Sequence, residues 1–125
     1  MRITRIAPLA MLLAVTAACA TTQVRQPLTD VPAGEYLLVE PEPEQYTAVA
    51  INEGAYTVRV GDQVWSGTHW VDGQGRAHIV DDAGECAGME SIWTYSYMSN
   101  RLTMELVSDA CPTREFSSTQ VWERM

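Results

Sequence analysis

Two alternating runs around a two-residue turn constrain the fold of this chain more than any other feature. The runs Ser-Ile-Trp-Thr-Tyr-Ser-Tyr-Met and Arg-Leu-Thr-Met-Glu-Leu-Val flank Ser99-Asn100, a pair that suits a tight hairpin turn. Pairing Met98 with Arg101 places the large apolar and aromatic side chains on one face and the polar ones on the other. A slip of one residue would mix the two faces, so the register is well specified. The stretch Glu90–Val107 therefore predicts a β-hairpin with one dry face.

Short apolar or alternating runs recur along the rest of the chain and are bounded by Gly, Pro, Asn or Asp. They predict strands at residues 34–40, 46–51, 55–60, 63–70, 76–81, 91–98, 101–107 and 114–122. Outside the N-terminal segment, no stretch has the apolar repeat of a helix. Short strands joined in sequence by tight turns are typical of a meander. We therefore predict an all-β fold, a small eight-stranded antiparallel up-and-down barrel whose closure removes the exposed sheet edges.

Residues 1–18 have the pattern of a secretory signal. Arg2 and Arg5 form a short basic region, and the apolar segment Ile6–Val15 that follows is too short to cross a bilayer as a helix. We expect this segment to be removed. Residues 19–32 are polar and contain two prolines, which predicts a flexible tether, and residues 33–125 form the predicted barrel domain.

The end of the signal resembles the lipobox of bacterial lipoproteins. In Val15-Thr16-Ala17-Ala18-Cys19 a cysteine follows two small residues, although Thr16 stands where an aliphatic residue is usual. The resemblance implies that Cys19 is lipidated and becomes the mature N-terminus. Ala20 in the next position resembles the outer-membrane pattern, so we expect a lipid anchor in the outer membrane of the cell envelope, facing the periplasm. The alternative is ordinary cleavage near Ala20, which would discard Cys19 and give a soluble periplasmic or secreted protein.

The chain has three cysteines, at positions 19, 86 and 111. Cysteines of exported domains usually pair, and an odd one needs an explanation. The register of the hairpin brings Cys86 and Cys111 to its same open end, which predicts a disulfide between them. Two free buried thiols are the alternative. The disulfide leaves Cys19 for lipid attachment.

The charge of the chain argues against two classes of partner. Sixteen acidic residues face eight basic ones, for a net charge of −8, and removal of the signal takes away two arginines. An acidic chain is unsuited to nucleic acid and to electrostatic attachment to anionic lipid. It is compatible with a basic protein partner. Solubility is the simpler explanation of the acidity.

Two groups of residues resemble lipocalins and related calycins. Gly34-Glu35-Tyr36 is similar to the Gly-x-Trp that opens those domains, with Tyr in place of Trp. Leu102-Thr103-Met104, Asp109-x-Cys111-x-x-Arg114 and Trp122 resemble small lipocalin-like exported bacterial domains, whose functions are mostly unassigned. The resemblance covers the predicted barrel domain.

The resemblance implies that an arginine near the last strand packs across Tyr36 and closes one end of the barrel. Arg114 and Arg124 are the candidates. The domain is shorter than a typical lipocalin and has no evident C-terminal helix, which argues against a large ligand cavity.

The predicted interior face is rich in aromatic side chains. Such a face suits a pocket for a small hydrophobic ligand, with tyrosine hydroxyls to orient it. In an eight-stranded barrel the same side chains can instead fill the interior, and we favour this for so short a domain. The candidate ligand-binding residues are Tyr56, Trp65, His69, Trp93, Tyr95, Tyr97 and Met104.

The positions of the two histidines indicate whether the interior could hold a metal ion. His69 shares the inward parity of Trp65, and His78 lies on the next predicted strand. A four-residue loop between these strands would bring the histidines together. A three-residue loop turns Ala77 and Ile79 inward and exposes His78, and we expect this arrangement because it buries apolar residues. We therefore predict no metal site and no cofactor.

The remaining polar clusters have simpler explanations than chemistry. The acidic loop at Asp81–Glu85 lacks the alternating spacing of a calcium loop. Asp109 and Arg114 are expected to pair across a turn as an exposed ion pair of small energy. The chain has no Gly-x-Ser-x-Gly nucleophile motif, no phosphate-binding glycine loop and no lysine. We predict that the protein is not an enzyme.

Three functions are consistent with this sequence. The first is a non-catalytic binding module for a small hydrophobic or amphipathic ligand. The second is an acidic protein-binding module, such as an inhibitor of a basic envelope enzyme of the lysozyme type. The third is a purely structural envelope lipoprotein. The aromatic interior face and the lipocalin resemblance favour the first.

Overall fold

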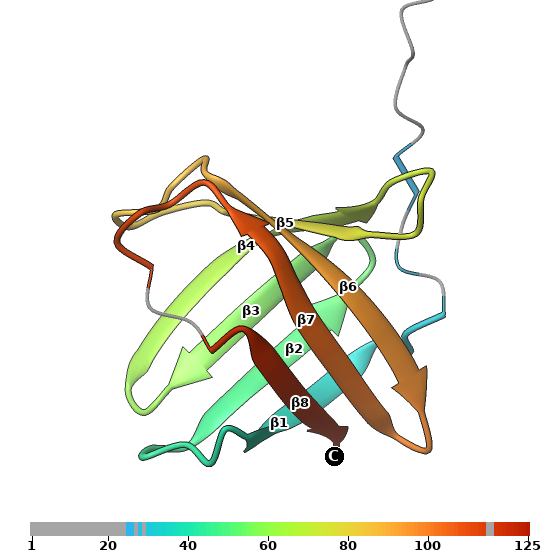
Figure 1. Cartoon of the computed structure of the whole chain (residues 1–125). Coiled ribbons are helices and arrows are strands. Elements are labelled where there is room, and N and C mark those ends of the chain that lie inside the picture. Colours follow the sequence, from blue (N-terminus) through green and yellow to red (C-terminus); the bar gives the residue numbers. More distant parts are fainter. Residues whose placement is uncertain (1–24, 27, 29, 115–116) are drawn as a thin grey trace, which may run out of the picture.

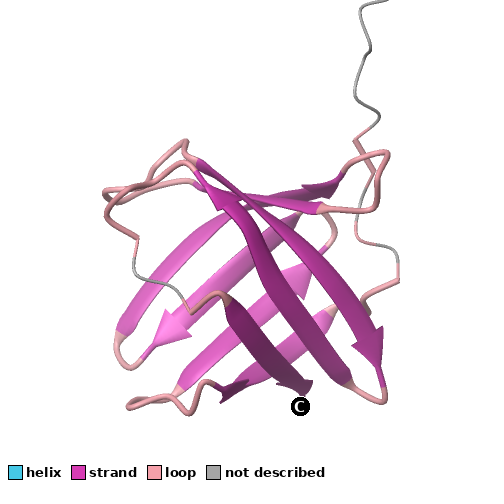
Figure 2. Ribbon diagram, in the orientation of Figure 1, coloured by secondary structure: helices cyan, strands magenta, loops and turns pink. Residues whose placement is uncertain are grey.

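Eight antiparallel strands follow one another in sequence around a closed barrel (Figure 1). The computed structural model describes residues 25–26, 28, 30–114 and 117–125, so the predicted signal, Cys19 and the first part of the tether lie outside the described residues. The strands are β1 (Gly34–Glu40), β2 (Thr47–Asn52), β3 (Ala55–Val60), β4 (Gln63–Val71), β5 (Ala77–Asp81), β6 (Glu90–Met98), β7 (Arg101–Asp109) and β8 (Thr119–Arg124). The described part of the chain contains strands and loops and no helix (Figure 2). This confirms the predicted all-β, up-and-down barrel, a topology that is compatible with the lipocalin-like fold.

The hairpin of β6 and β7 has the register that the sequence predicts. Met98 lies opposite Arg101, and Trp93 lies opposite Leu106. Ser99 and Asn100 at the turn have φ angles of 52° and 63°, the left-handed conformation that a two-residue hairpin turn requires. The register shifts only beyond Trp93, toward the open end of the hairpin. Alternation of polar and apolar residues thus determined this pairing.

The last strand is shorter than predicted. The sequence predicts a strand at 114–122, whereas β8 begins at Thr119 and ends at Arg124. Thr119 pairs with Glu105 on β7, and the other edge of β8 pairs with β1, where Arg124 lies opposite Tyr36. Arg114 lies outside the strand, and carboxylates of Asp81 and Asp109 flank its side chain, as described below.

The segment before β1 packs on one end of the barrel. Gln26 and Val71 exchange two backbone hydrogen bonds, with N to O distances of 3.0 and 2.7 Å. Val31 is buried in the core, Leu28 packs against it, and the hydroxyl of Tyr36 donates to the carbonyl of Pro32 at 2.6 Å. Figure 1 shows this blue segment beside the turn that joins β4 to β5. The described residues of the predicted tether therefore contact the barrel.

Gly67 on β4 shows how tightly one side of the barrel is packed. A Cβ atom at this position would collide with the hydroxyl of Tyr56 and with the carbonyl oxygen of Val80. Glycine within a strand often marks a place where other atoms approach closely. Gly67 therefore allows the phenol end of Tyr56 to approach the backbone of β4 closely.

The disulfide is confirmed. Cys86 in the loop after β5 and Cys111 after β7 are bonded, with their Cα atoms 5.6 Å apart. The bridge joins two loops at the same end of the barrel. Separately, no helix among the described residues is long and apolar enough to cross a membrane.

Candidate ligand-binding cavity

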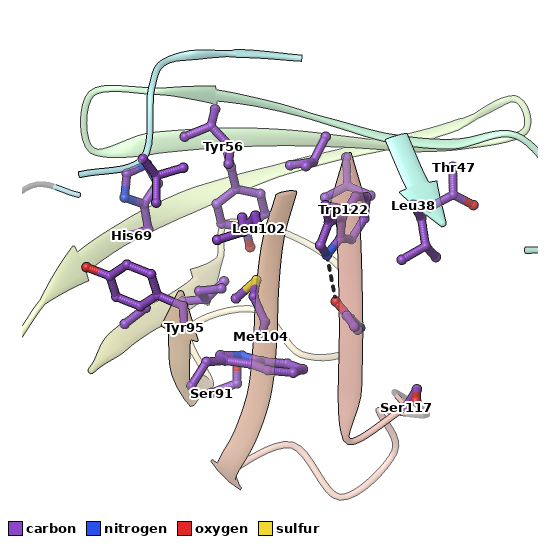
Figure 3. A pocket seen from close by; sticks show the side chains of 18 of the residues that line it. Leu38, Thr47, Tyr56, His69, Ser91, Tyr95, Leu102, Met104, Ser117 and Trp122 are labelled. Carbon is purple, nitrogen blue, oxygen red and sulfur yellow. Dashed lines mark hydrogen bonds between the residues drawn. The ribbon is translucent and has the colours of Figure 1, made fainter. Parts of the chain in front are cut away.

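The interior of the barrel contains a cavity of about 300 Å³. Most of its wall is apolar, and Figure 3 shows Tyr56, Leu102 and Met104 between His69 on one side and Leu38 on the other. This corrects the expectation that side chains fill the barrel. The aromatic side chains of the wall come from β3, β4, β6 and β8, whereas β2 and β5 contribute smaller inward residues such as Val49 and Ala77.

The structure brings most of the predicted interior residues together. Tyr56, Trp65, His69, Trp93, Tyr95 and Met104 line the cavity. Tyr97 does not line it, although it packs against the core. Its ring lies edge-on to Tyr36, with centroids 6.3 Å apart, and its hydroxyl donates to Asn100 Oδ1 at 3.2 Å. Tyr97 is thus a packing residue at the end of the barrel that the N-terminal segment covers.

The indole N–H groups of Trp93 and Trp122 have partners within the protein. Nε1 of Trp93 donates to the hydroxyl of Ser91 at 2.9 Å, and Nε1 of Trp122 donates to Oε1 of Gln120 at 3.1 Å, the dashed line in Figure 3. Ser91 is fully buried. These bonds stabilise the indole rings in fixed orientations and leave neither N–H free for a ligand.

Tyr95 connects the cavity wall to the N-terminal segment. Its hydroxyl donates to Oδ1 of Asp30 at 2.9 Å. Burial of the ring, together with this carboxylate, raises the pKa of Tyr95 to about 12. The hydroxyl therefore stays protonated and keeps donating across the physiological range, which stabilises the segment that covers this end of the barrel.

A buried charged cluster lies on the cavity wall. The guanidinium of Arg114 lies between two carboxylates, with Nη1 3.4 Å from Oδ2 of Asp81 and Nε 3.2 Å from Oδ2 of Asp109. The side chain of Arg114 is only 5% exposed. The expected pairing of Asp109 with Arg114 is therefore present, but the expectation that it is exposed is wrong. The loop after β7 folds this side chain back against the barrel, which the sequence distance between the partners does not reveal.

Tyr56 extends the charged cluster into the barrel. Its hydroxyl donates to Oδ1 of Asp81. Burial and this hydrogen bond both raise the pKa of Tyr56 well above the ordinary value for tyrosine. Tyr56, Asp81 and Arg114 all line the cavity, and their polar atoms bind to one another. This network stabilises the wall.

Of the two arginines suggested by the lipocalin resemblance, Arg124 lies beside Tyr36. It is opposite Tyr36 in the β1–β8 pairing, and its Nη2 donates to the carbonyl of Ala33 at 3.3 Å. Burial, together with Tyr97, raises the pKa of Tyr36, and the charge of Arg124 acts against this rise. Arg114 lies instead in the charged cluster with Asp81.

His69 points into the barrel from β4, as predicted. It is 6% exposed and lies at the cavity wall. Its Nε2 lies 2.8 Å from the carbonyl oxygen of Asn52 and 3.0 Å from that of Ala55, at the hairpin between β2 and β3. Its Nδ1 is buried and has no hydrogen-bond partner in the part of the chain that the structure describes. Among the described residues, Nδ1 of His69 is therefore a buried acceptor at the wall that the protein leaves unsatisfied.

His78 faces away from the cavity, but the expectation that it is exposed is wrong. Ala77 is buried and Ile79 lies opposite His69, as the three-residue loop predicts. His78 itself is 4% exposed, because it stacks on Trp70 with ring centroids 3.8 Å apart. The ring of Trp70 on the same face of the sheet and the β4–β5 turn together cover the imidazole.

Two carboxylates satisfy the ring of His78. Nε2 lies 2.8 Å from Oδ2 of Asp72, and Nδ1 lies 2.8 Å from Oε1 of Glu90. The hydrogen bond from His78, helped by backbone N–H groups of Arg76 and Gln74, holds the pKa of Asp72 well below its usual range. Among the described residues no group of three or more His, Cys, Asp or Glu side chains could hold a metal ion. This cluster stabilises the β4–β5 turn.

Sequence reasoning missed Leu28 and Val31, which line the cavity from the segment predicted as a tether. An apolar residue on either side of Asp30, in an otherwise polar stretch, was the available signal. It also missed Asp81, although Asp81 has the same inward parity as Ala77 and Ile79 on β5.

A scan against protein-family models, a search of curated proteins and a search of solved structures each found no match for this chain.

Proposed function

We propose that this protein is a non-catalytic binding module that holds one small hydrophobic or amphipathic molecule inside its barrel. The cavity of about 300 Å³ with a largely apolar wall is the observation that carries the proposal. Pockets of this size and composition are typical of small-molecule sites. Since a water molecule takes up about 30 Å³, the cavity suits a ligand on the order of ten non-hydrogen atoms. Most polar groups of the wall bind one another, which favours a binding role over a catalytic one.

The proposal includes a lipid anchor and a relationship to lipocalin-like exported domains. The Cys86–Cys111 disulfide supports an exported location, because disulfides persist in oxidising compartments. It also leaves Cys19 as the one cysteine of the three outside the bridge. The barrel topology and Gly34-Glu35-Tyr36 support the lipocalin-like relationship. The protein would then carry its ligand near the membrane that anchors it.

We expect linear alcohols to bind with an affinity that rises with chain length and then falls. Each buried methylene contributes about 0.8 kcal/mol, or roughly a fourfold gain in affinity, until the chain fills the cavity. Titration from butanol to dodecanol, followed by tryptophan fluorescence and by calorimetry, measures this series. Trp65, Trp93 and Trp122 line the cavity and report its occupation. A flat series without a maximum would contradict binding inside the barrel.

The matched variants Val58→Phe and Val64→Phe test the location of the ligand. Val58 lines the cavity, whereas Val64 on the neighbouring strand is 53% exposed on the outer face. We expect Val58→Phe to weaken alcohol binding at least tenfold, because the added ring occupies about a phenyl group's share of the space, and Val64→Phe to leave it unchanged. Equal effects of the two substitutions would argue against an interior site.

We expect the protein recovered from a bacterial membrane fraction to begin at an acylated Cys19. Intact-mass measurement of the full-length gene product gives the acyl mass directly. The variant Cys19→Ser removes the acceptor thiol, so it should appear in the soluble fraction with the same cavity binding. An unmodified mature chain that begins after Ala20 would show ordinary signal cleavage and would refute the anchor.

A further inference from the structure

The hydrogen bonds of His69 determine which ring nitrogen carries the proton. Nε2 lies within hydrogen-bond distance of two carbonyl oxygens, those of Asn52 and Ala55, at 2.8 and 3.0 Å. A carbonyl oxygen can only accept, so Nε2 must be the donor. In the neutral imidazole the other nitrogen, Nδ1, then carries a lone pair and is an acceptor. The end of the β2–β3 hairpin thus fixes the tautomer of this side chain.

The acceptor of His69 is buried without a partner. The residue is 6% exposed, and Nδ1 forms no hydrogen bond with any described residue. The two ring nitrogens point to different sides of the imidazole. Nε2 points to the backbone at the barrel wall, and the ring lies along the cavity beside Tyr95 (Figure 3). A buried polar atom that remains unsatisfied is costly, so the site favours a molecule that satisfies it.

Five other polar side chains of the cavity wall are already engaged within the protein. The hydroxyls of Tyr56 and Tyr95 donate to Asp81 and Asp30, and the guanidinium of Arg114 lies between two carboxylates. The indole N–H groups of Trp93 and Trp122 also donate to side chains of the protein. A ligand that accepts hydrogen bonds would compete with these pairs, whereas a ligand that donates can satisfy Nδ1 of His69 without breaking any of them.

We infer that the natural ligand is a hydrogen-bond donor, an alcohol or phenol with an otherwise apolar body, whose hydroxyl donates to Nδ1 of His69. The inference rests on the proposed function and deepens it, because it names the polar group of the ligand and the atom that recognises it. The hydroxyl lies at the end of the cavity where His69 and Tyr95 lie, and the apolar body extends past Met104 toward Leu38.

The matched pair 5-nonanol and 5-nonanone tests the inference. The two molecules share one carbon skeleton and are achiral, but only the alcohol donates. We expect the wild-type protein to bind the alcohol roughly ten- to a hundredfold more tightly than the ketone, since the ketone leaves Nδ1 unsatisfied and brings its own lone pairs against it. Calorimetric titration measures both dissociation constants under the same conditions.

Two substitutions at His69 separate recognition from packing. His69→Phe keeps a flat ring but removes the acceptor, so the preference for the alcohol should disappear while the ketone still binds. His69→Gln retains an amide N–H for the carbonyls of Asn52 and Ala55 and an oxygen that accepts. It should therefore keep much of the preference. A His69→Phe variant that binds both ligands with the wild-type ratio would overturn the inference.

A measurement on the wild-type chain covers the case in which His69→Phe does not fold. The chain contains two histidines, so nitrogen-15 spectra of the imidazoles are simple to assign. The His69→Gln variant lacks the resonances of His69 and thereby identifies them. The Nδ1 resonance of His69 should shift when 5-nonanol is added and stay in place with 5-nonanone. A resonance that the bound alcohol does not move would show that Nδ1 is satisfied by water or by nothing, and would overturn the inference.

The outcomes distinguish the two proposals. Equal affinity for alcohol and ketone in the wild-type protein rejects the donor ligand and leaves the binding module in place. If neither molecule binds and the linear alcohols also fail, the proposed function is rejected and the inference falls with it. Alcohol preference that depends on the acceptor at position 69 supports both.

Discussion

Replacing Arg114 with Met is expected to lower the free energy of unfolding by about 3–5 kcal/mol. The substitution keeps much of the length of the side chain but removes its charge. The carboxylates of Asp81 and Asp109, whose side chains are only 14% and 11% exposed, then lose the cation that lies 3.4 and 3.2 Å away. The penalty arises because two largely buried negative charges remain without it.

The surface pair Arg101–Glu123 offers a matched control. Its Nη2 to Oε2 distance is 3.7 Å, and the two side chains are 56% and 52% exposed. Exposed pairs of this kind contribute about 0–1 kcal/mol, so Arg101→Met should change stability little. Urea denaturation followed by tryptophan fluorescence gives both values. Similar losses in the two variants would show that the burial of Arg114 has no energetic consequence.

The charged cluster also connects stability to the proposed binding site. Asp81 accepts the hydrogen bond of Tyr56, and both residues line the cavity. Loss of Arg114 should therefore weaken alcohol binding as well as folding, because the ring of Tyr56 is oriented through Asp81. If the Arg114→Met variant unfolds more easily but binds alcohols with unchanged affinity, the substitution affects only the loop between β7 and β8 and not the cavity.

The double variant Cys86→Ser, Cys111→Ser is expected to be about 3.5 kcal/mol less stable than the oxidised wild-type protein. The bridge closes a loop with a sequence separation of 25 residues, and the chain-entropy relation gives about this value for a loop of that length. A domain of this size has a modest core, so the loss is a large fraction of its stability. Thermal and urea unfolding of both proteins measure the difference.

Addition of a reductant provides the control for the disulfide. It should bring the wild-type protein to the stability of the double variant and leave the variant unchanged. The backbone N–H of Cys111 also donates to Oδ1 of Asp109 at 3.0 Å, so the bridge and the charged cluster share a loop. We therefore expect the Arg114→Met and cysteine variants to be non-additive when combined. Strict additivity would mean that the loop keeps its geometry without the bridge.

Local patterns in the sequence determined the strands and their register. Polar and apolar alternation predicted the pairing of Tyr97 with Leu102, and turn residues such as Asn52 and Gly61 predicted where the early strands end. These predictions succeeded because a strand shows two faces with a period of two residues, and a register error exposes the whole apolar face. The disulfide followed from the same register.

The candidate site was predictable only in part. Parity along the strands placed Trp65, His69 and Trp93 inside, and all three line the cavity. Parity did not reveal that space would remain, because the free volume depends on how the large and small side chains of eight strands meet around the barrel. Parity also placed Tyr97 among the site residues. It predicts that the side chain points inward, but it does not predict how far along the barrel axis the side chain lies.

The sequence by itself determined the all-β architecture, the order of the strands and the partners of the bridge, all of which depend on short-range alternation and turns. The tertiary structure decided the rest. It buried His78 under Trp70, drew Arg114 into a cluster with Asp81 and left one acceptor of His69 unsatisfied. The stack of His78 on Trp70 forms between the neighbouring strands β4 and β5, whereas Arg114 and Asp81 meet only when the loop after β7 comes back to the end of β5.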